Sequence, residues 1–460
     1  MDWLKQAEKY ENEMIKDLIA LVNIPSITDE KTKTDNSPFG YQMRCVLEKA
    51  LALGKRDGFK VKDVDGYVGV IEYGDNEEAI GVLGHLDVVP VSDGWKTDPF
   101  NAIINDGYLF ARGASDDKGP TIAAYYAMRL LKDNNIKLKR NIQLILGTDE
   151  ESGMRCMQYY KSKEKLPLGG FVPDSVFPVV YAEKGIMNVL LHNKVDTVIK
   201  HLDAGQRANI VIADAIAKVD KPPLSDLFDF YLKANDLKGE LWQDADSSFY
   251  RIYGSGAHGA RPYLGVNASW HLFNFIGAAY HDEFSSKTAF LLKDWMASNL
   301  NNRIEGVYLG NLTMNLGIVK IIDRHASLTL DIRYPNDIDD QTILSNINEA
   351  IAQQDYPLVA TIKTVKPPLF VNPESEMIKT LVDVYRKHTN DSFTPIMTMS
   401  GGTYARTLPN FVGYGAGFVN RKKPSHVGSA HENDEGIEIR SLVLACAIYA
   451  EALVKLADIL

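Results

Sequence analysis

The fold is decided by AIGVLG at residues 79–84, which is followed by TIAAYYAMRLLKDN at 121–134 and NIQLILG at 141–147. The first and last of these are short apolar runs typical of buried strands, and the segment between them repeats apolar residues at helical spacing. A strand, a helix and a second strand in succession are typical of a parallel sheet. FPVVYA at 177–182 predicts a further buried strand. We therefore expect an α/β fold in which helices flank a mixed, largely parallel sheet.

The pattern changes after Lys184-Gly185. LDIRYPNDIDDQTILSNINEAIAQ, residues 330–353, predicts a strand, a turn and a helix, as in a small α+β module. From residue 376 a helical pattern leads back to strands rich in glycine and to a final apolar helix near 440–458. The predicted organisation is one domain over 1–185 and 376–460, split by an inserted α+β domain over 186–375.

The composition excludes several classes of protein. The 460 residues are 45% hydrophobic and 24% charged, which is ordinary for a soluble chain of two or three domains. The net charge is -10 without an extended basic patch, so we expect neither nucleic acid nor a membrane as a partner. Cys45, Cys156 and Cys446 lie far apart with no C-x-x-C spacing, which fits a reducing compartment. The N-terminal segment lacks the apolar core of a signal peptide, and no run approaches the roughly 20 apolar residues of a membrane span. A cytoplasmic protein is therefore expected.

Ionisable side chains follow the predicted strands or precede the next helix. Ligands of a parallel sheet bind beyond the carboxyl ends of its strands, so chemistry is expected in these segments. They are GHLDVVP with His85 and Asp87, GASDDKGP with Asp116 and Asp117, GTDEESG with Asp149, Glu150 and Glu151, FVPDSVFP with Asp174, and GSAHENDE with His431.

Each of these residues alone has an ordinary structural explanation, because an acid at a helix start is usually a cap and a single histidine is usually structural. Together, neighbouring carboxylates at the edge of a buried sheet repel one another unless a cation or an arginine neutralises them. No arginine-rich segment lies nearby, so a pair of metal ions is the simplest solution. Two histidines with three carboxylates and no thiolate suit zinc, manganese or cobalt. Asp87 shares a face of the extended chain with His85 and could hold its second ring nitrogen.

Five of these motifs, in this order, carry a resemblance to a known family. GHLDVVP, RGASDDKGP, GTDEESG, VPDSVFP and SAHENDE resemble the signatures of the dinuclear-metal aminoacylase, carboxypeptidase and dipeptidase superfamily. Within it the chain is most similar to the PepV-like bacterial dipeptidases, over essentially its whole length and including DDKGPTIAAYYA and GGTYAR. The resemblance implies a catalytic α/β domain with a smaller inserted lid domain.

The resemblance also implies roles for single residues. One metal ion would be held by His85 and Asp174, the other by Glu151 and His431, with Asp116 bridging the two. Zinc is expected first, with manganese or cobalt as alternatives. Glu150 would be the general base, taking a proton from a water molecule whose pKa two cations bring towards neutrality. Asp87 would orient His85, and Asp117 would cap the following helix.

GSGAHGARP at 254–262 has two interpretations. Its glycines have the G-x-G-x-x-G spacing of a dinucleotide-binding loop, but that motif requires strand, tight turn and helix in direct succession. Pro262 and Gly265 interrupt the run before a helical pattern begins near Asn267. AHGARPYLGVN resembles instead the family segment in which a lid histidine, here His258, contacts the substrate carbonyl oxygen.

Further lid contacts follow from the resemblance. Arg333 would bind a substrate carboxylate, although a surface ion pair with Asp331 or Asp337 is the alternative. Asn209 is a weaker candidate for substrate binding, and the backbone of Gly401 and Gly402 would lie against the substrate.

The implied function is metal-dependent hydrolysis of the amide bond of dipeptides with broad specificity, so small peptides are the expected partners. The alternative is an N-acyl-amino-acid deacylase with the same site. A metal-free relative would have lost a ligand or the base, and none is missing. The dimeric members of the family have a much shorter lid and borrow the histidine from a neighbouring subunit. The long lid of this chain therefore predicts a monomer.

Overall fold

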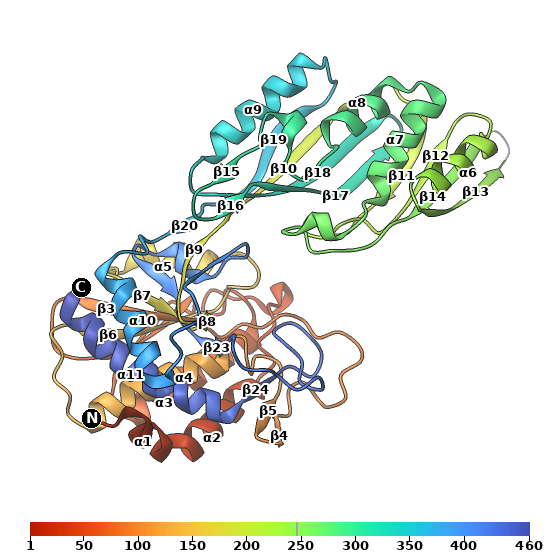
Figure 1. The fold of residues 1–460 in the computed structure, drawn as a ribbon. Coiled ribbons are helices and arrows are strands. Elements are labelled where there is room, and N and C mark those ends of the chain that lie inside the picture. The colour runs from red at the N-terminus through yellow and green to blue at the C-terminus, as the bar shows by residue number, and fades with distance from the viewer. Residues whose placement is uncertain (245–246) are drawn as a thin grey trace. The chain divides into compact units, whose positions relative to one another are not determined.

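The computed structural model describes residues 1–244 and 247–460, which form two compact units (Figure 1). Unit 1 consists of Met1–Ala182, Phe370–Thr398 and Gly402–Leu460, and unit 2 of Glu183–Leu369 and Met399–Gly401. The short piece Met399–Gly401 lies inside the segment 376–460 that the sequence assigned to the first domain. It belongs to unit 2 because the Met399 carbonyl accepts the backbone N–H of Lys184.

Unit 1 contains a nine-stranded sheet in which β1, β2, β6, β3, β7, β22 and β9 are neighbours in that order, completed by β20 and β21. The four central strands β6, β3, β7 and β22 are parallel, whereas β1 pairs antiparallel with β2, β2 with β6, and β9 with β22. This confirms the mixed sheet, whose parallel part is limited to the four central strands. The strands of this sheet are β1 (Lys60–Val64), β2 (Val68–Tyr73), β3 (Ala79–His85), β6 (Asn141–Gly147), β7 (Gly170–Val172), β9 (Val180–Glu183), β20 (Leu369–Phe370), β21 (Met397–Met399) and β22 (Phe411–Gly413).

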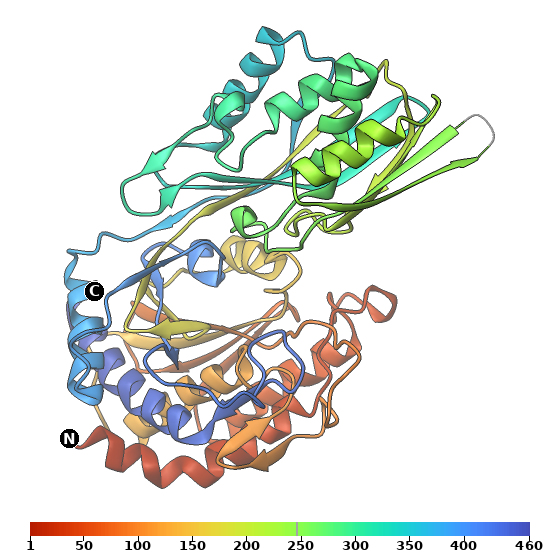
Figure 2. The same cartoon turned by 45° about the vertical axis from the view of Figure 1, so that its right-hand side comes forward.

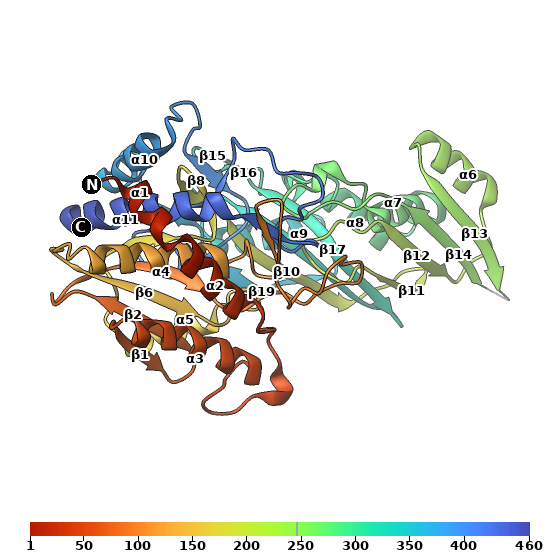
Figure 3. The same ribbon diagram turned by 90° about the horizontal axis from the view of Figure 1, so that it is seen from below.

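Helices cover both faces of this sheet. Gly69 of β2 faces side chains of α3, and Gly84 of β3 faces the start of α4. Both glycines pair with Leu146 of β6, so α3 and α4 lie on the same face of the sheet. Tyr404 lies against Gly147, on the opposite face. Helix α4 packs directly with α1, α2 and α11, and α10 packs on α11 (Figure 3). The helices are α1 (Trp3–Ala7), α2 (Glu11–Val22), α3 (Tyr41–Arg56), α4 (Lys118–Asp133), α5 (Arg155–Lys163), α10 (Glu376–Thr389) and α11 (Ile439–Ile459).

The predicted strand FPVVYA is wrong as a single element. Strand β8 (Ser175–Phe177) ends at Phe177, the first residue of FPVVYA, and pairs with β23 (Ala416–Phe418). Strand β9 begins at Val180 and pairs with β22. Pro178 separates the two strands, because proline has no N–H to donate to a ladder. A small third sheet joins β4 (Ile103–Asn105), β5 (Tyr108–Phe110) and β24 (Gly436–Glu438).

Unit 2 is an eight-stranded antiparallel sheet in the order β13-β14-β12-β11-β17-β18-β10-β19. Burial alternates along β10 and β14, so one face is covered, and α7 packs on β12 and β14 while α9 packs on β19 (Figure 2). Its elements are β10 (Gly185–Lys194), β11 (Ile199–Ala204), β12 (Asp214–Val219), α6 (Ser225–Ala234), β13 (Lys238–Asp244), β14 (Ser247–Tyr253), α7 (Ala268–Tyr280), α8 (Glu283–Leu291), β15 (Glu305–Gly306), β16 (Gly310–Asn311), β17 (Thr313–Ile322), β18 (His325–Tyr334), α9 (Asp340–Gln353) and β19 (Val359–Lys366).

The stretch GSGAHGARP lies between β14 and α7. The chain passes from β14 through this loop and a 3-10 turn at Pro262–Leu264 before α7 begins, with the Asn267 side chain as its N-cap. The strand-turn-helix geometry of a dinucleotide site is therefore absent from this described segment. Among residues 1–244 and 247–460, none of the helices is both apolar and long enough for a membrane span.

Candidate metal centre

The carboxyl ends of β3 and β6 place the first site residues side by side. His85 is the last residue of β3 and is in register with Gly147, the last residue of β6. The next N–H, that of Leu86, donates to the Gly147 carbonyl at 2.9 Å. The acidic residues after Gly147 therefore begin directly beside His85, as expected at the carboxyl edge of parallel strands.

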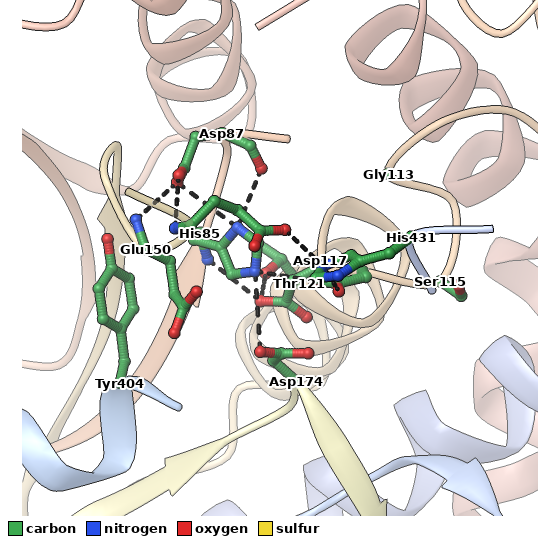
Figure 4. Close-up of polar contacts among 12 residues, drawn as sticks. His85, Asp87, Gly113, Ser115, Asp117, Thr121, Glu150, Asp174, Tyr404 and His431 are labelled. Atoms are coloured by element: carbon green, nitrogen blue, oxygen red, sulfur yellow. Dashed lines mark hydrogen bonds and ion pairs between the residues drawn. The ribbon is translucent and has the colours of Figure 1, made fainter. Parts of the chain in front are cut away.

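Five side chains gather here in two sets that share one aspartate, and Figure 4 labels three of them, His85, Asp174 and His431. His85, Asp116 and Asp174 form one set, and Asp116, Glu151 and His431 form the other, each with its donor atoms within 4.8 Å of one another. Asp116 Oδ1 lies 3.0 Å from His85 Nε2, and its Oδ2 lies 3.0 Å from His431 Nε2. All five predicted ligands thus lie in unit 1, with Asp116 between the two histidines.

The electrostatics of these sets show an excess of negative charge. Burial alone would lower the pKa of His85, but Asp116, Asp174 and Asp87 raise it well above its ordinary value. Hydrogen bonds to Asp116 and Glu151 raise the pKa of His431 to about 10. Among the residues that the structure describes, the two histidines provide every ion pair of these carboxylates. The carboxylates therefore favour positive charge at both sets.

The same surroundings disfavour negative charge on Asp174 and Glu151. Burial, and then the neighbouring Asp116, raises the pKa of Asp174. Burial raises the pKa of Glu151 as well. A cation bound between these groups would remove the repulsion, and imidazole nitrogens with carboxylate oxygens are donors suited to zinc, manganese or cobalt. The residues present therefore fit a pair of divalent cations.

Glu150 lies beside the two sets without belonging to either. The residue is 8% exposed, and its buried Oε1 atom has no hydrogen-bond partner among the residues that the structure describes. Burial raises the pKa of Glu150 well above the usual range. Figure 4 shows the carboxylate pointing into the space near Asp174 and the ring of His85. A buried carboxylate without a partner is costly, which is typical of a group kept for chemistry.

Asp87 contacts His85 through both its backbone carbonyl and its carboxylate. The His85 Nδ1 atom lies 3.0 Å from the backbone carbonyl of Asp87 and 3.5 Å from its carboxylate. The carboxylate also accepts the backbone N–H groups of Glu150 and Glu151, at 3.0 and 2.9 Å. Asp87 thus connects the His85 strand end to the acidic loop.

Asp117 lies at the predicted cap position of the following helix, α4, but it does not cap that helix with its side chain. Its Oδ2 accepts the backbone N–H of His85 at 3.1 Å and the Thr121 hydroxyl at 2.8 Å. The carboxylate therefore turns towards β3, where it fixes the backbone of a site residue.

Sequence reasoning missed a buried ion pair between Arg112 and Glu435, whose Nη1 and Oε2 atoms lie 2.6 Å apart. Both residues stand within quoted motifs, RGASDDKGP and GSAHENDE, but no spacing rule connects positions so far apart. It also missed Tyr404, whose hydroxyl accepts the N–H of Asp149 at 3.2 Å and whose ring lies edge-on to that of His85.

Unit 2 holds His258 and Asn209 on neighbouring segments. The Asn209 carbonyl accepts the N–H of Gly259 at 2.7 Å, directly after His258. The His258 Nδ1 atom accepts the backbone N–H of Ala260 at 3.1 Å, so the proton of the neutral ring is on Nε2. Burial, and then Arg333, lowers the pKa of His258, which favours this neutral form.

Arg333 forms an ion pair with Asp331, one of the two partners of the alternative interpretation, but this pair is buried and does not lie on the surface. Its Nε and Nη2 atoms lie 3.0 Å from Asp331 Oδ2, with 5% of Arg333 and 1% of Asp331 exposed. Its Nη1 donates to the Ser400 carbonyl at 3.3 Å, next to Gly401. Asp337 is not its partner. Gly401 belongs to unit 2 with Arg333, whereas Gly402 belongs to unit 1.

The chain matches peptidase family M20/M25/M40 over residues 81–455. It is 34% identical over 472 residues to the "Putative dipeptidase" of Staphylococcus epidermidis, with 99% of each chain covered. It is also 34% identical over 473 residues to "Putative dipeptidase YtjP" of Bacillus subtilis, with 99% of this chain and 100% of that one covered.

Solved structures agree on the fold. Human carnosine dipeptidase 1 has a TM-score of 0.58 at 15% identity, with 99% of this chain and 98% of that chain covered. The dipeptidase Dug1p of Saccharomyces cerevisiae has a TM-score of 0.59 at 14% identity, with the same coverage. The family match spans most of the sequence, and the two bacterial relatives each align over 99% of it. The chain belongs to peptidase family M20/M25/M40.

Proposed function

We propose that this protein is a broad-specificity dipeptidase that hydrolyses the amide bond of small peptides with two divalent cations. The observation that carries the proposal is Asp116, whose two carboxylate oxygens each lie 3.0 Å from a histidine of a different donor set. The buried carboxylate of Glu150 lies beside them, and its Oε1 has no hydrogen-bond partner within the described part of the chain. Bacterial relatives that carry the name dipeptidase support the choice of substrate.

His85 and Asp174 would hold one cation, Glu151 and His431 the other, and Asp116 both. When bound, two such cations polarise a carbonyl group and lower the pKa of a water molecule towards neutrality. Zinc is the first candidate because its usual ligands are imidazole and carboxylate, and manganese or cobalt would accept the same donors.

Glu150 would act as the general base. Its carboxylate would take the proton of the attacking water and return it to the departing amine nitrogen. The amides of Glu150 and Glu151 are both held by Asp87, so the position of Glu150 is fixed relative to the ligand that follows it. We therefore assign Asp87 to positioning, through its carboxylate for the acidic loop and through its carbonyl for His85.

Residues of unit 2 would serve the substrate. The neutral His258 ring, with its proton on Nε2, would donate to the oxyanion that forms on the carbonyl oxygen. Arg333 would bind the substrate carboxylate with those guanidinium N–H groups that do not bind Asp331 or Ser400. Asn209 and the backbone of Gly401 and Gly402 complete the proposed substrate contacts.

The test is an assay of the purified protein on dipeptides, tripeptides and N-acyl amino acids, each with zinc, manganese or cobalt added in turn. Dipeptides are expected to be cleaved fastest. Treatment with a chelator should abolish turnover, and adding back one of the metals should restore it. A preference for N-acyl amino acids would replace the dipeptidase with a deacylase that uses the same site. Full activity in a sample shown to be free of metal would disprove the proposed mechanism.

A further inference from the structure

Glu435 is completely buried next to the metal centre and its carboxylate accepts five hydrogen bonds. One comes from Arg112 Nη1 at 2.6 Å, and the other four come from a single short loop. These four donors are the N–H groups of Gly113, Ser115 and Asp116, at 3.2, 2.8 and 3.1 Å, and the Ser115 hydroxyl at 2.9 Å. Glu435 therefore fixes the backbone of the loop that ends in Asp116.

Arg112 extends this contact to the segment that carries His431. It is 1% exposed, and its Nη2 donates to the His431 carbonyl at 3.3 Å while Nη1 binds Glu435. The guanidinium also lies over the ring of Trp95, 5.2 Å from the centroid. One planar group thus joins two positions of the segment 431–435.

The segment needs such support. His431 has a backbone φ of 67°, in the left-handed region that is unfavourable for a residue with a Cβ atom, and its side chain is half exposed. Little packing therefore holds the ring in place. On its other side the segment is held at Asp434, whose carboxylate accepts the backbone N–H of Lys96 at 2.8 Å.

We propose that Glu435 and Arg112 are positioning residues that hold Asp116 and His431 in register with each other. The inference rests on the proposed function, because it assigns these two ligands to a common cation. The set of Asp116, Glu151 and His431 takes ligands from both the loop that ends in Asp116 and the segment 431–435. The other set, His85, Asp116 and Asp174, contains Asp116 but no residue of 431–435. Loss of the Glu435 carboxylate should therefore lower the affinity for one cation more than the affinity for the other.

The experiment is a titration of Zn²⁺ into chelator-treated protein, with wild type and Glu435→Gln compared. The wild type is expected to bind two ions. In the variant, the affinity for one ion should fall by about 10- to 100-fold, the usual effect of removing a partner that supports a metal ligand. The affinity for the other ion should change less.

A matched control separates positioning from general stability. Glu451 of α11 is also buried in unit 1, where it accepts Lys387 Nζ at 2.7 Å and contacts His388 Nε2 at 2.8 Å. Glu451→Gln removes a similar buried carboxylate elsewhere, so it should lower the urea midpoint without changing either zinc affinity. Two unchanged affinities in Glu435→Gln, or equal losses in both variants, would overturn the proposal.

Two further measurements cover a variant that fails to fold. Arg112→Lys keeps the positive charge but has a single nitrogen, which cannot reach both Glu435 and the His431 carbonyl, so the same loss at one ion is expected. In metal-free wild type, the amides of Ser115 and Asp116 should exchange slowly with deuterium, and fast exchange would contradict the role of Glu435. If zinc binds as expected but no peptide is cleaved, the proposed function fails while the positioning role stands.

Discussion

Burial is the main cause that raises the pKa of Glu150, and the carboxylates of Asp174 and Glu151 raise it further, whereas His85 lowers it. Glu150→Ala should reduce kcat by about 100- to 10,000-fold, the usual contribution of a general base. The bound metal, counted by elemental analysis, should stay at the wild-type ratio because Glu150 belongs to neither donor set.

Glu150→Gln provides a second measurement with nearly the same side-chain volume. Removing a negative charge whose Oε1 is buried with no hydrogen-bond partner among the described residues should leave the urea midpoint at or above that of wild type. Wild-type turnover in either variant would remove Glu150 as the base. A loss of bound metal would instead make it a ligand.

His258 is expected to act on the rate and not on the fold. His258 is exposed, and among residues 1–244 and 247–460 its ring has one hydrogen bond, which Nδ1 accepts from the backbone N–H of Ala260. His258→Ala should therefore lower kcat by roughly 100-fold, as loss of an oxyanion donor does, with little change in KM. His201→Ala, at an exposed position of β11, is the control and should keep full activity. An unchanged kcat in His258→Ala would exclude the role.

The sequence predicted the residues of the site better than their contacts. His85 and Glu150 were identified because apolar strands ending in ionisable residues place them at one sheet edge. The Arg112–Glu435 pair, 323 residues apart, leaves no local pattern. The carboxylates of Asp87 and Asp117 bind backbone N–H groups of other segments, and such partners depend on how the loops meet in three dimensions.

At the scale of elements, the contact of β3 with α4 depends on Gly84. A Cβ atom there would lie 2.0 Å from Thr121 Oγ1 and 3.0 Å from Asp117 Oδ2, the groups that hold the His85 backbone. Gly84→Ala should therefore destabilise the protein by about 1–3 kcal/mol, measured by urea unfolding, and should also weaken metal binding.

Two variants test the cause. Thr121→Ala removes the oxygen that a methyl group at Gly84 would strike, so the double variant should recover part of the stability lost in Gly84→Ala. Gly256→Ala is the control, because its added Cβ would meet nothing closer than 3.9 Å. Additive losses in the double variant would show that the clash is not the cause.

Long elements of the chain could be predicted, and short ones could not. The helix at 121–134 and the strands at 79–84 and 141–147 are confirmed by α4, β3 and β6, because each carries enough apolar residues to define a period. FPVVYA misled because apolar character alone does not separate one buried strand from two strands that meet at a proline. Strands of two or three residues, such as β20 and β21, are fixed by their partners and not by their own sequence.

At the scale of the whole molecule, both edges of the unit 2 sheet are protected against pairing with a second copy. β13 carries Lys238, Glu240 and Asp244, and β19 carries Lys363 and Lys366. Charged residues on edge strands disfavour pairing between chains. We therefore predict a monomer, and sedimentation equilibrium should give a mass near 51.2 kDa. A mass near twice that value would contradict the prediction.

Mixing two inactive variants tests whether the proposed site is completed within one chain. Glu150→Ala removes the proposed base in unit 1, and His258→Ala removes the proposed oxyanion donor in unit 2. If each chain uses its own His258, an equimolar mixture should have the mean of the two residual activities. If His258 came from a second copy, subunits would exchange into mixed dimers with one intact site, and activity would rise well above that mean. The mixture should be incubated at several protein concentrations, because recovery that depends on association grows with concentration, whereas the activity per mole of a monomer does not change.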